Sequence, residues 1–141
     1  ILKDFDYSKF VVCTDAGLAS NANRKFNDKG SRAFITTQSI KKLKKHLKEW
    51  ALDPKGWHLQ GSNKTFNLED IDESTHSESL FYKERWIKEN GLEQKLIVTY
   101  SVKHKNYQRN IRNGQIERAQ KAIDTNSTKI KKANQNDYKR F

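Results

Sequence analysis

The order of apolar and polar residues predicts a strand–helix–strand unit near the start of the chain. Residues 10–14, FVVCT, are apolar or β-branched, which is typical of a short strand buried on both faces of a parallel sheet. Residues 15–17, DAG, interrupt this strand, and Ser20 or Asn21 can cap a short helix after it. Residues 32–37, RAFITT, predict a second strand. The two strands would then pair in parallel through the helix between them.

An amphipathic basic helix is expected next, over residues 39–52. Ile40, Leu43 and Leu47 recur at helical spacing, with lysines between them, and Ser39 is a candidate cap.

The middle of the chain changes to a polar, β-rich pattern. Short strands are expected at 57–59 and 65–68, followed by an exposed loop. We expect the acidic residues of this loop to pair with the basic helices; they are Glu69, Asp70, Asp72, Glu73 and Glu78.

A β-hairpin is the clearest local prediction. Residues alternate in character over 80–87 and 95–101, and the Asn90-Gly91 pair between them favours a two-residue turn. A helix over 102–123 should follow, with Gly114 weakening its middle. Its apolar residues are expected near one stripe: Tyr107, Ile111, Ile116, Ala119 and Ile123.

These elements predict an α/β chain of mixed α+β character. We expect residues 1–52 to form part of an α/β core. Residues 53–125 would be a β-rich insertion with a C-terminal helix, and residues 126–141 a polar tail or linker.

Composition points to a polyanionic partner without excluding a merely soluble basic domain. The chain has 28 Lys and Arg against 17 Asp and Glu, a formal net charge of +11. No apolar run approaches the ~20 residues of a membrane helix, so no membrane partner is expected. The single cysteine, Cys13, favours a reducing, cytoplasmic setting. The start at Ile1 and the absence of methionine suggest a piece of a longer protein.

Asp15 has two interpretations. An aspartate after a strand is often a turn or capping residue. It can also bind Mg²⁺, since functional groups gather at the carboxyl ends of strands in open α/β sheets and Mg²⁺ prefers oxygen ligands. A metal site would need further carboxylates. The histidines and Cys13 lack metal-ligand spacing, and no phosphate-binding glycine loop is present.

Two sets of cations are candidate phosphate contacts, with a solvated helix face as the alternative for each. The first set is Lys41, Lys42, Lys44, Lys45 and Lys48. The second set is Lys103, Lys105, Arg109, Arg112, Arg118 and Lys121, and it includes one aromatic residue, Tyr107, among these cations. Four further aromatic residues could stack on bases, but packing in a small sheet explains them more simply: Trp57, Phe81, Tyr82 and Trp86.

Two segments carry a family resemblance. Residues 13–36, CTDAGLASNANRKFNDKGSRAFIT, resemble the second acidic block of the DDE transposases of bacterial insertion sequences. In that block an apolar strand ends in Asp-x-Gly, and a helix and an "FI" strand follow. Residues 100–119, YSVKHKNYQRNIRNGQIERA, are similar to a segment inside an insertion in the RNase H-like core of these enzymes. Leu18 departs from the family, in which many members carry an aromatic residue there.

The resemblance implies a partial RNase H-like core and metal-dependent DNA cleavage and strand transfer. Asp15 would be the second of three catalytic carboxylates and a ligand of Mg²⁺ or Mn²⁺, and Gly17 would let the turn pass close to the site. The partners would be transposon ends and target DNA, the parent protein a bacterial cytoplasmic enzyme and a homodimer.

The third carboxylate of the family is a glutamate in the pattern Tyr-x2-Arg-x3-Glu-x6-Lys. Glu117 does not fit, because the tyrosine, arginine and lysine positions hold Asn110, Asn113 and Asp124. The first and third carboxylates are therefore expected outside this chain, which should be inactive and bind no metal by itself. The alternative function is a non-enzymatic, basic nucleic-acid-binding module.

Overall fold

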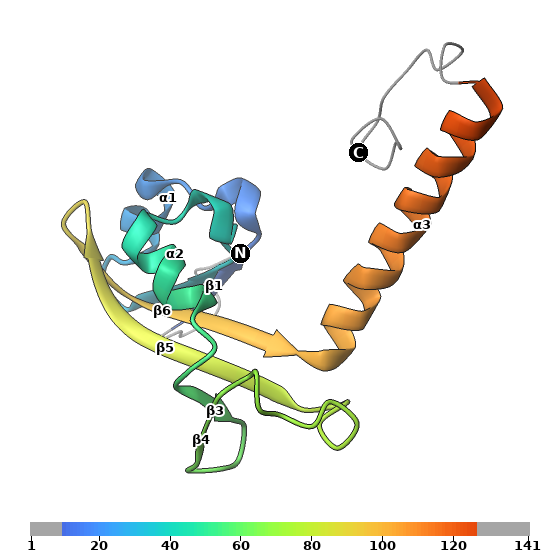
Figure 1. Ribbon diagram of the computed structural model, residues 1–141. Helices are drawn as coiled ribbons and strands as arrows, with labels where there is room; N and C mark the ends of the chain where they lie inside the picture. Colours follow the sequence, from blue (N-terminus) through green and yellow to red (C-terminus); the bar gives the residue numbers. More distant parts are fainter. Residues whose placement is uncertain (1–9, 127–141) are drawn as a thin grey trace. The chain divides into compact units, whose positions relative to one another are not determined.

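The computed structural model describes residues 10–126, which form a mixed α+β fold with two separate sheets (Figure 1). The chain divides into two compact units that interleave in the sequence. The first unit contains the described residues up to Pro54 together with Lys83–Val98. The second contains Lys55–Tyr82 and the described residues from Thr99 onward.

The predicted strand–helix–strand unit is confirmed in the first unit, but the expected burial of its first strand on both faces is wrong, since no residue of Phe10–Thr14 is buried. Strand β1 (Phe10–Thr14) pairs in parallel with β2 (Arg32–Thr36), and helix α1 (Asn21–Asn27) connects them. Ser20 caps α1, since its hydroxyl accepts a hydrogen bond from the Asn23 backbone N–H at 3.2 Å. The connection back to β2 passes through Gly30, whose φ of +67° is a conformation that glycine adopts easily.

The helix predicted over residues 39–52 is interrupted. A short 3₁₀ helix covers Ile40–Lys42, Leu43 and Lys44 are extended, and α2 runs over Lys45–Leu52. Ser39 occupies the N-cap position of this 3₁₀ helix, but its side chain makes no capping hydrogen bond. No Gly or Pro lies at the break. Leu43 is buried there, and tertiary packing overrides helix propensity.

The predicted hairpin is confirmed. Strand β5 (Leu80–Glu89) and strand β6 (Leu92–Ser101) are neighbours in the four-stranded sheet, whose order is β4-β3-β5-β6. Asn90 and Gly91 both have positive φ, at 52° and 76°, as a type I′ turn requires. The twist of this turn matches the twist of the strands it joins.

Lys83 of β5 is buried, with 4% of its surface exposed, and holds the end of α2. Its ammonium donates hydrogen bonds to the backbone carbonyls of Trp50 at 3.2 Å and of Asp53 at 2.6 Å. The last carbonyls of a helix have no partner inside the helix, so a lysine here satisfies them. Burial lowers the pKa of Lys83, while the Asp53 carboxylate acts in the opposite direction.

Replacing Lys83 by alanine should lower the free energy of unfolding by about 2 kcal/mol, because the carbonyls of Trp50 and Asp53 lose a charged donor. Urea unfolding followed by tryptophan fluorescence measures this change. Lys88→Ala is the matched control: the same charge is removed from an exposed position of the same strand, and the expected change is within about 0.5 kcal/mol. Equal effects of the two variants would contradict this role of Lys83.

The second unit is built around aromatic side chains. Strands β3 (Trp57–Leu59) and β4 (Thr65–Phe66) pair antiparallel, and β3 also pairs with β5, with Leu59 opposite Phe81. Phe81 has no exposed surface, and its ring meets those of Phe66, His76 and Tyr100 at centroid distances of 5.5, 5.4 and 6.3 Å. Core packing is therefore the role of Phe81.

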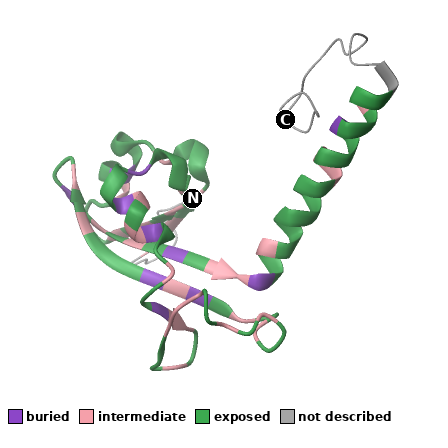
Figure 2. Ribbon diagram, in the orientation of Figure 1, coloured by how far each residue is buried: buried purple, intermediate pink, exposed green. Residues whose placement is uncertain are grey.

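Helix α3 (Val102–Asn126) is mostly exposed along its length (Figure 2). Among its described side chains, only Val102 and Ala119 are buried. The single apolar stripe expected from the sequence does not form. A regular helix turns about 100° per residue, which places Ile116 about 180° away from Tyr107.

Candidate functional site

Asp15 lies at the carboxyl end of β1 and is exposed. It is the N-cap of a short 3₁₀ turn over Ala16–Leu18, and its Oδ1 accepts a hydrogen bond from the Gly17 N–H at 2.9 Å. The capping interpretation of Asp15 is thus correct as far as local geometry goes. A capping carboxylate still has a second oxygen, and among the described residues no cation pairs with it.

Two threonines fix the backbone that carries Asp15. The hydroxyl of Thr14 donates to that of Thr36 at 3.0 Å, and the Thr36 hydroxyl donates to the Asp15 carbonyl at 3.3 Å. The backbone N–H of Thr37 bonds to the Thr14 carbonyl at 3.3 Å, which extends the pairing of β1 and β2 by one step. The ends of both strands are therefore tied together beneath Asp15. Periodicity gave no reason to single out these hydroxyls.

Gly17 leaves room for the carboxylate. A Cβ atom added to Gly17 would lie 3.1 Å from Asp15 Oδ1, closer than ordinary van der Waals contact. Any other residue at this position would press on the side chain of Asp15. The glycine predicted next to the site therefore has a steric role toward Asp15.

Asp15 alone cannot hold a metal ion tightly. Within residues 10–126, no group of three or more His, Cys, Asp or Glu side chains could bind one. The donor chemistry of Asp15 suits a hard cation such as Mg²⁺, because an exposed carboxylate supplies an oxygen ligand. It fits as one ligand of such a site, and the other protein ligands would have to come from outside the described residues.

The first set of cations lies in the first unit, around α2. Two of its members are engaged in ion pairs: Lys44 with Glu89 at 3.1 Å and Lys45 with Glu49 at 3.9 Å. Lys41 and Lys42 are exposed on the 3₁₀ turn, whereas Lys48 is half-buried on α2. This set is split between two elements and partly neutralised by glutamates.

The second set of cations lies on α3 in the second unit, and it occupies two faces of the helix. The spacing of Lys105, Arg109 and Arg112 (i, i+4, i+7) puts them on one face. The rest of the set lies on the opposite side by the same rule; its members are Lys103, Tyr107, Arg118 and Lys121. A helix with cations on both sides can meet phosphates with either face.

Glutamates of the loop at residues 67–79 pair with the first turns of α3, as expected from the sequence. Glu78 accepts a hydrogen bond from Lys103 at 2.8 Å, and Glu73 accepts one from Lys105. The hydrogen bond from Lys105 lowers the pKa of Glu73. The corresponding bonds raise the pKa of Lys103 and of Lys105.

Arg24 of α1 is a polar residue that the sequence analysis missed. It is buried, with 9% of its surface exposed, and its guanidinium donates to the side-chain carbonyls of Gln38 and Gln94. Its Nε is buried without a hydrogen-bond partner. Both partners are uncharged amides, and no sequence pattern connects residues so far apart in the chain.

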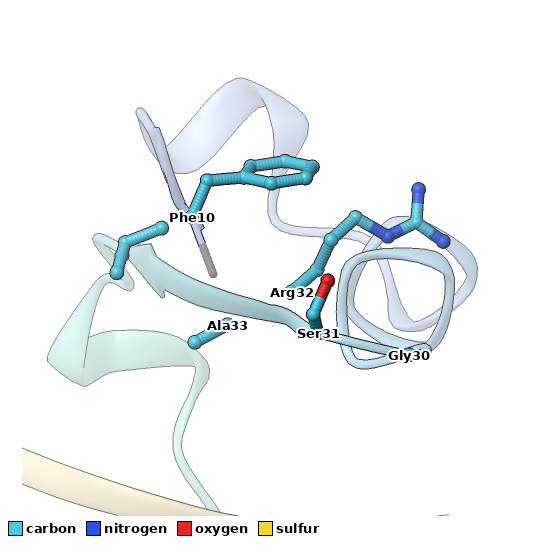
Figure 3. Close-up of a pocket in the computed structure, with 6 residues that line it drawn as sticks. Phe10, Gly30, Ser31, Arg32 and Ala33 are labelled. Atoms are coloured by element: carbon cyan, nitrogen blue, oxygen red, sulfur yellow. The ribbon is translucent and has the colours of Figure 1, made fainter. Parts of the chain in front are cut away.

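A shallow cavity of about 380 Å³ lies at the amino ends of β1 and β2 (Figure 3). Phe10, Val11 and residues 30–33 line it. None of the predicted site residues is among them. Asp15 lies at the other end of β1, so this cavity is not part of the candidate metal site.

Comparison with known proteins leaves the family of the chain open. No protein-family model matches it, and neither a curated protein nor a solved structure was found that matches. Among the helices of residues 10–126, none combines the length and the apolar character needed to cross a membrane.

Proposed function

We propose that the chain supplies one catalytic carboxylate, Asp15, to a metal-dependent DNA strand-cleavage and strand-transfer enzyme of the DDE transposase type. The observation that carries the proposal is the place of Asp15. It follows a parallel strand, it is exposed, its backbone is tied to the neighbouring strand, and a glycine leaves space beside it. In open α/β sheets this edge is where ligands bind.

The β1–α1–β2 unit would belong to an RNase H-like core. Asp15 would hold Mg²⁺ or Mn²⁺ together with two carboxylates from outside the described residues. When bound, a pair of such ions supplies activation of the attacking oxygen and stabilisation of the leaving oxygen in phosphoryl transfer. The part of this chain is to fix the direction of one ligand, through the Gly17 N–H and the hydroxyls of Thr14 and Thr36.

The basic residues of α3 would contact DNA. At about 1.5 Å per residue, α3 is about 37 Å long, which is close to one turn of B-DNA. Its arginines and lysines would give salt-sensitive affinity that does not depend on sequence. Transposon ends and target DNA are the proposed partners, in a bacterial cytoplasm and with a homodimeric parent protein.

A second candidate function is a nucleic-acid-binding module without catalysis. The exposure of α3 favours it, because DNA binding through this helix needs neither Asp15 nor a metal. The two functions differ in their metal dependence. Binding by charge alone would persist when divalent ions are removed.

The test is cleavage of labelled DNA ends by a polypeptide that contains this chain and the two further carboxylates. Nicking should occur in Mg²⁺ or Mn²⁺ and fall to background in EDTA, because the ions stabilise the charges of the reaction. DNA binding measured in parallel should survive EDTA. DNA binding that needs no metal, without nicking in either ion, would favour the binding module and contradict the proposed activity.

A further inference from the structure

The loop at residues 67–79, called here the acidic loop, is held in place by contacts within the second unit. Asp72 accepts hydrogen bonds from the Ser74 backbone and from the Ser74 and Thr75 hydroxyls, at 3.0, 2.7 and 2.6 Å. These bonds, the one from Thr75 above all, lower the pKa of Asp72 to about 2. The loop is therefore charged and locally ordered at neutral pH.

His76 connects the acidic loop to the aromatic core. Its ring lies edge-on to Phe66 and Phe81, at centroid distances of 5.9 and 5.4 Å, and its Nδ1 is 3.2 Å from the Ser79 hydroxyl. The backbone N–H groups of His76 and Ser79 bond to the carbonyls of Asp72 and His76. The glutamates on either side of His76 are therefore presented from an anchored segment.

Both of these glutamates reach the basic helix. Glu78 pairs with Lys103 and Glu73 with Lys105, one on each face of the first two turns of α3. Their carboxylates occupy the positions that phosphates would take on these two lysines. The positive charge of Arg109 also lowers the pKa of Glu73, so the loop interacts electrostatically with the next turn of the helix as well.

We infer that the acidic loop is an intramolecular competitor for DNA, which covers the first turns of α3 and lowers the affinity of this helix for phosphates. The inference rests on the proposed contact between α3 and DNA. A bound duplex would displace Glu73 and Glu78 and take over Lys103 and Lys105. The Glu78–Lys103 pair is exposed and the Glu73–Lys105 pair is partly exposed. Ion pairs that water can reach are weak, so DNA can displace them.

The test compares three forms of the 141-residue chain, binding a fluorescently labelled 20-base-pair duplex over a range of salt concentrations. The Glu73→Gln/Glu78→Gln variant should bind about five-fold more tightly than the wild type, as expected for the release of two surface ion pairs. The gain in affinity should be largest at low salt and shrink as salt rises, because added salt weakens the glutamate–lysine pairs that oppose DNA binding in the wild type. This salt dependence separates the loss of the ion pairs from a loosened loop, since loosening alone involves no charge.

The Glu69→Gln/Asp70→Asn variant is the matched control. It removes the same charge from the same loop at exposed carboxylates that make no ion pair with α3. It should change affinity less than two-fold and leave the salt dependence unchanged. If the two double variants behave alike, the inference is wrong while the DNA contact stands. If none of the three forms binds the duplex, the proposed contact and the inference both fail.

Discussion

Replacing Asp15 by asparagine is expected to lower DNA-end nicking at least 100-fold while leaving DNA binding nearly unchanged, in a polypeptide that contains this chain and the two further carboxylates. Asparagine keeps the shape of the side chain, and its carbonyl can still accept the hydrogen bond from Gly17. It removes the negative charge that a hard cation needs. Loss of one such electrostatic contribution to a transition state costs on the order of 10²–10³ in rate. Gel-based nicking in Mg²⁺ or Mn²⁺ and a parallel binding titration measure the two effects.

The control for this prediction is Glu117→Gln. Glu117 is an exposed acid on α3, and its neighbours in the sequence do not match the pattern around the third carboxylate of the DDE transposases that the sequence resembles. Nicking by this variant should stay within a few-fold of the wild type. Wild-type nicking by the Asp15→Asn variant would contradict the role of Asp15. A loss of nicking in the Glu117→Gln variant alone would transfer the third-carboxylate role to Glu117.

Replacing Phe81 by alanine should lower the free energy of unfolding by about 3–5 kcal/mol. The ring has no exposed surface and lies against three other aromatic rings, so its removal leaves a cavity and ends two edge-on contacts and one tilted contact. The total stability of a domain is commonly 5–15 kcal/mol, so this one change can unfold much of the chain at physiological temperature. Urea unfolding followed by the fluorescence of the buried Trp57 measures the loss.

Trp86→Ala provides the comparison for Phe81. Trp86 is a larger aromatic residue on the same strand, but 63% of its surface is exposed and its ring lies under the Lys95 ammonium at 5.5 Å. Its removal should cost about 1 kcal/mol, the size of a surface cation–π contact. A larger loss for Trp86 than for Phe81 would mean that the aromatic cluster around Phe81 does not hold the second unit together.

The local elements could be predicted because their signals lie within a few neighbouring residues. The Asn90-Gly91 pair specifies a type I′ turn by backbone sterics alone, and the hairpin follows from the alternation on either side. Ser20 at the start of α1 acts through a bond three residues away. The position of Asp15 at a strand end was visible for the same reason.

The roles of several charged side chains could not be predicted, because they depend on residues distant in the chain. Lys83 belongs to an alternating strand pattern, yet it is buried against carbonyls about thirty residues earlier. Arg24 lies on a short helix, yet its partners are Gln38 and Gln94. The sequence does not identify the group that will form hydrogen bonds with a charged side chain once folding has removed it from water.

The sequence by itself determined the order of strands and helices, the turn that closes the hairpin, and the excess of positive charge. These properties depend on backbone sterics, on short-range hydrogen bonds and on composition. Only the tertiary structure decided that the helix of residues 39–52 breaks at Leu43, and that the cations of α3 occupy two faces. It also decided that Glu73 and Glu78 meet Lys105 and Lys103. Burial and ion pairing join residues that are close only after folding, because their energies depend on distance in space and not along the chain.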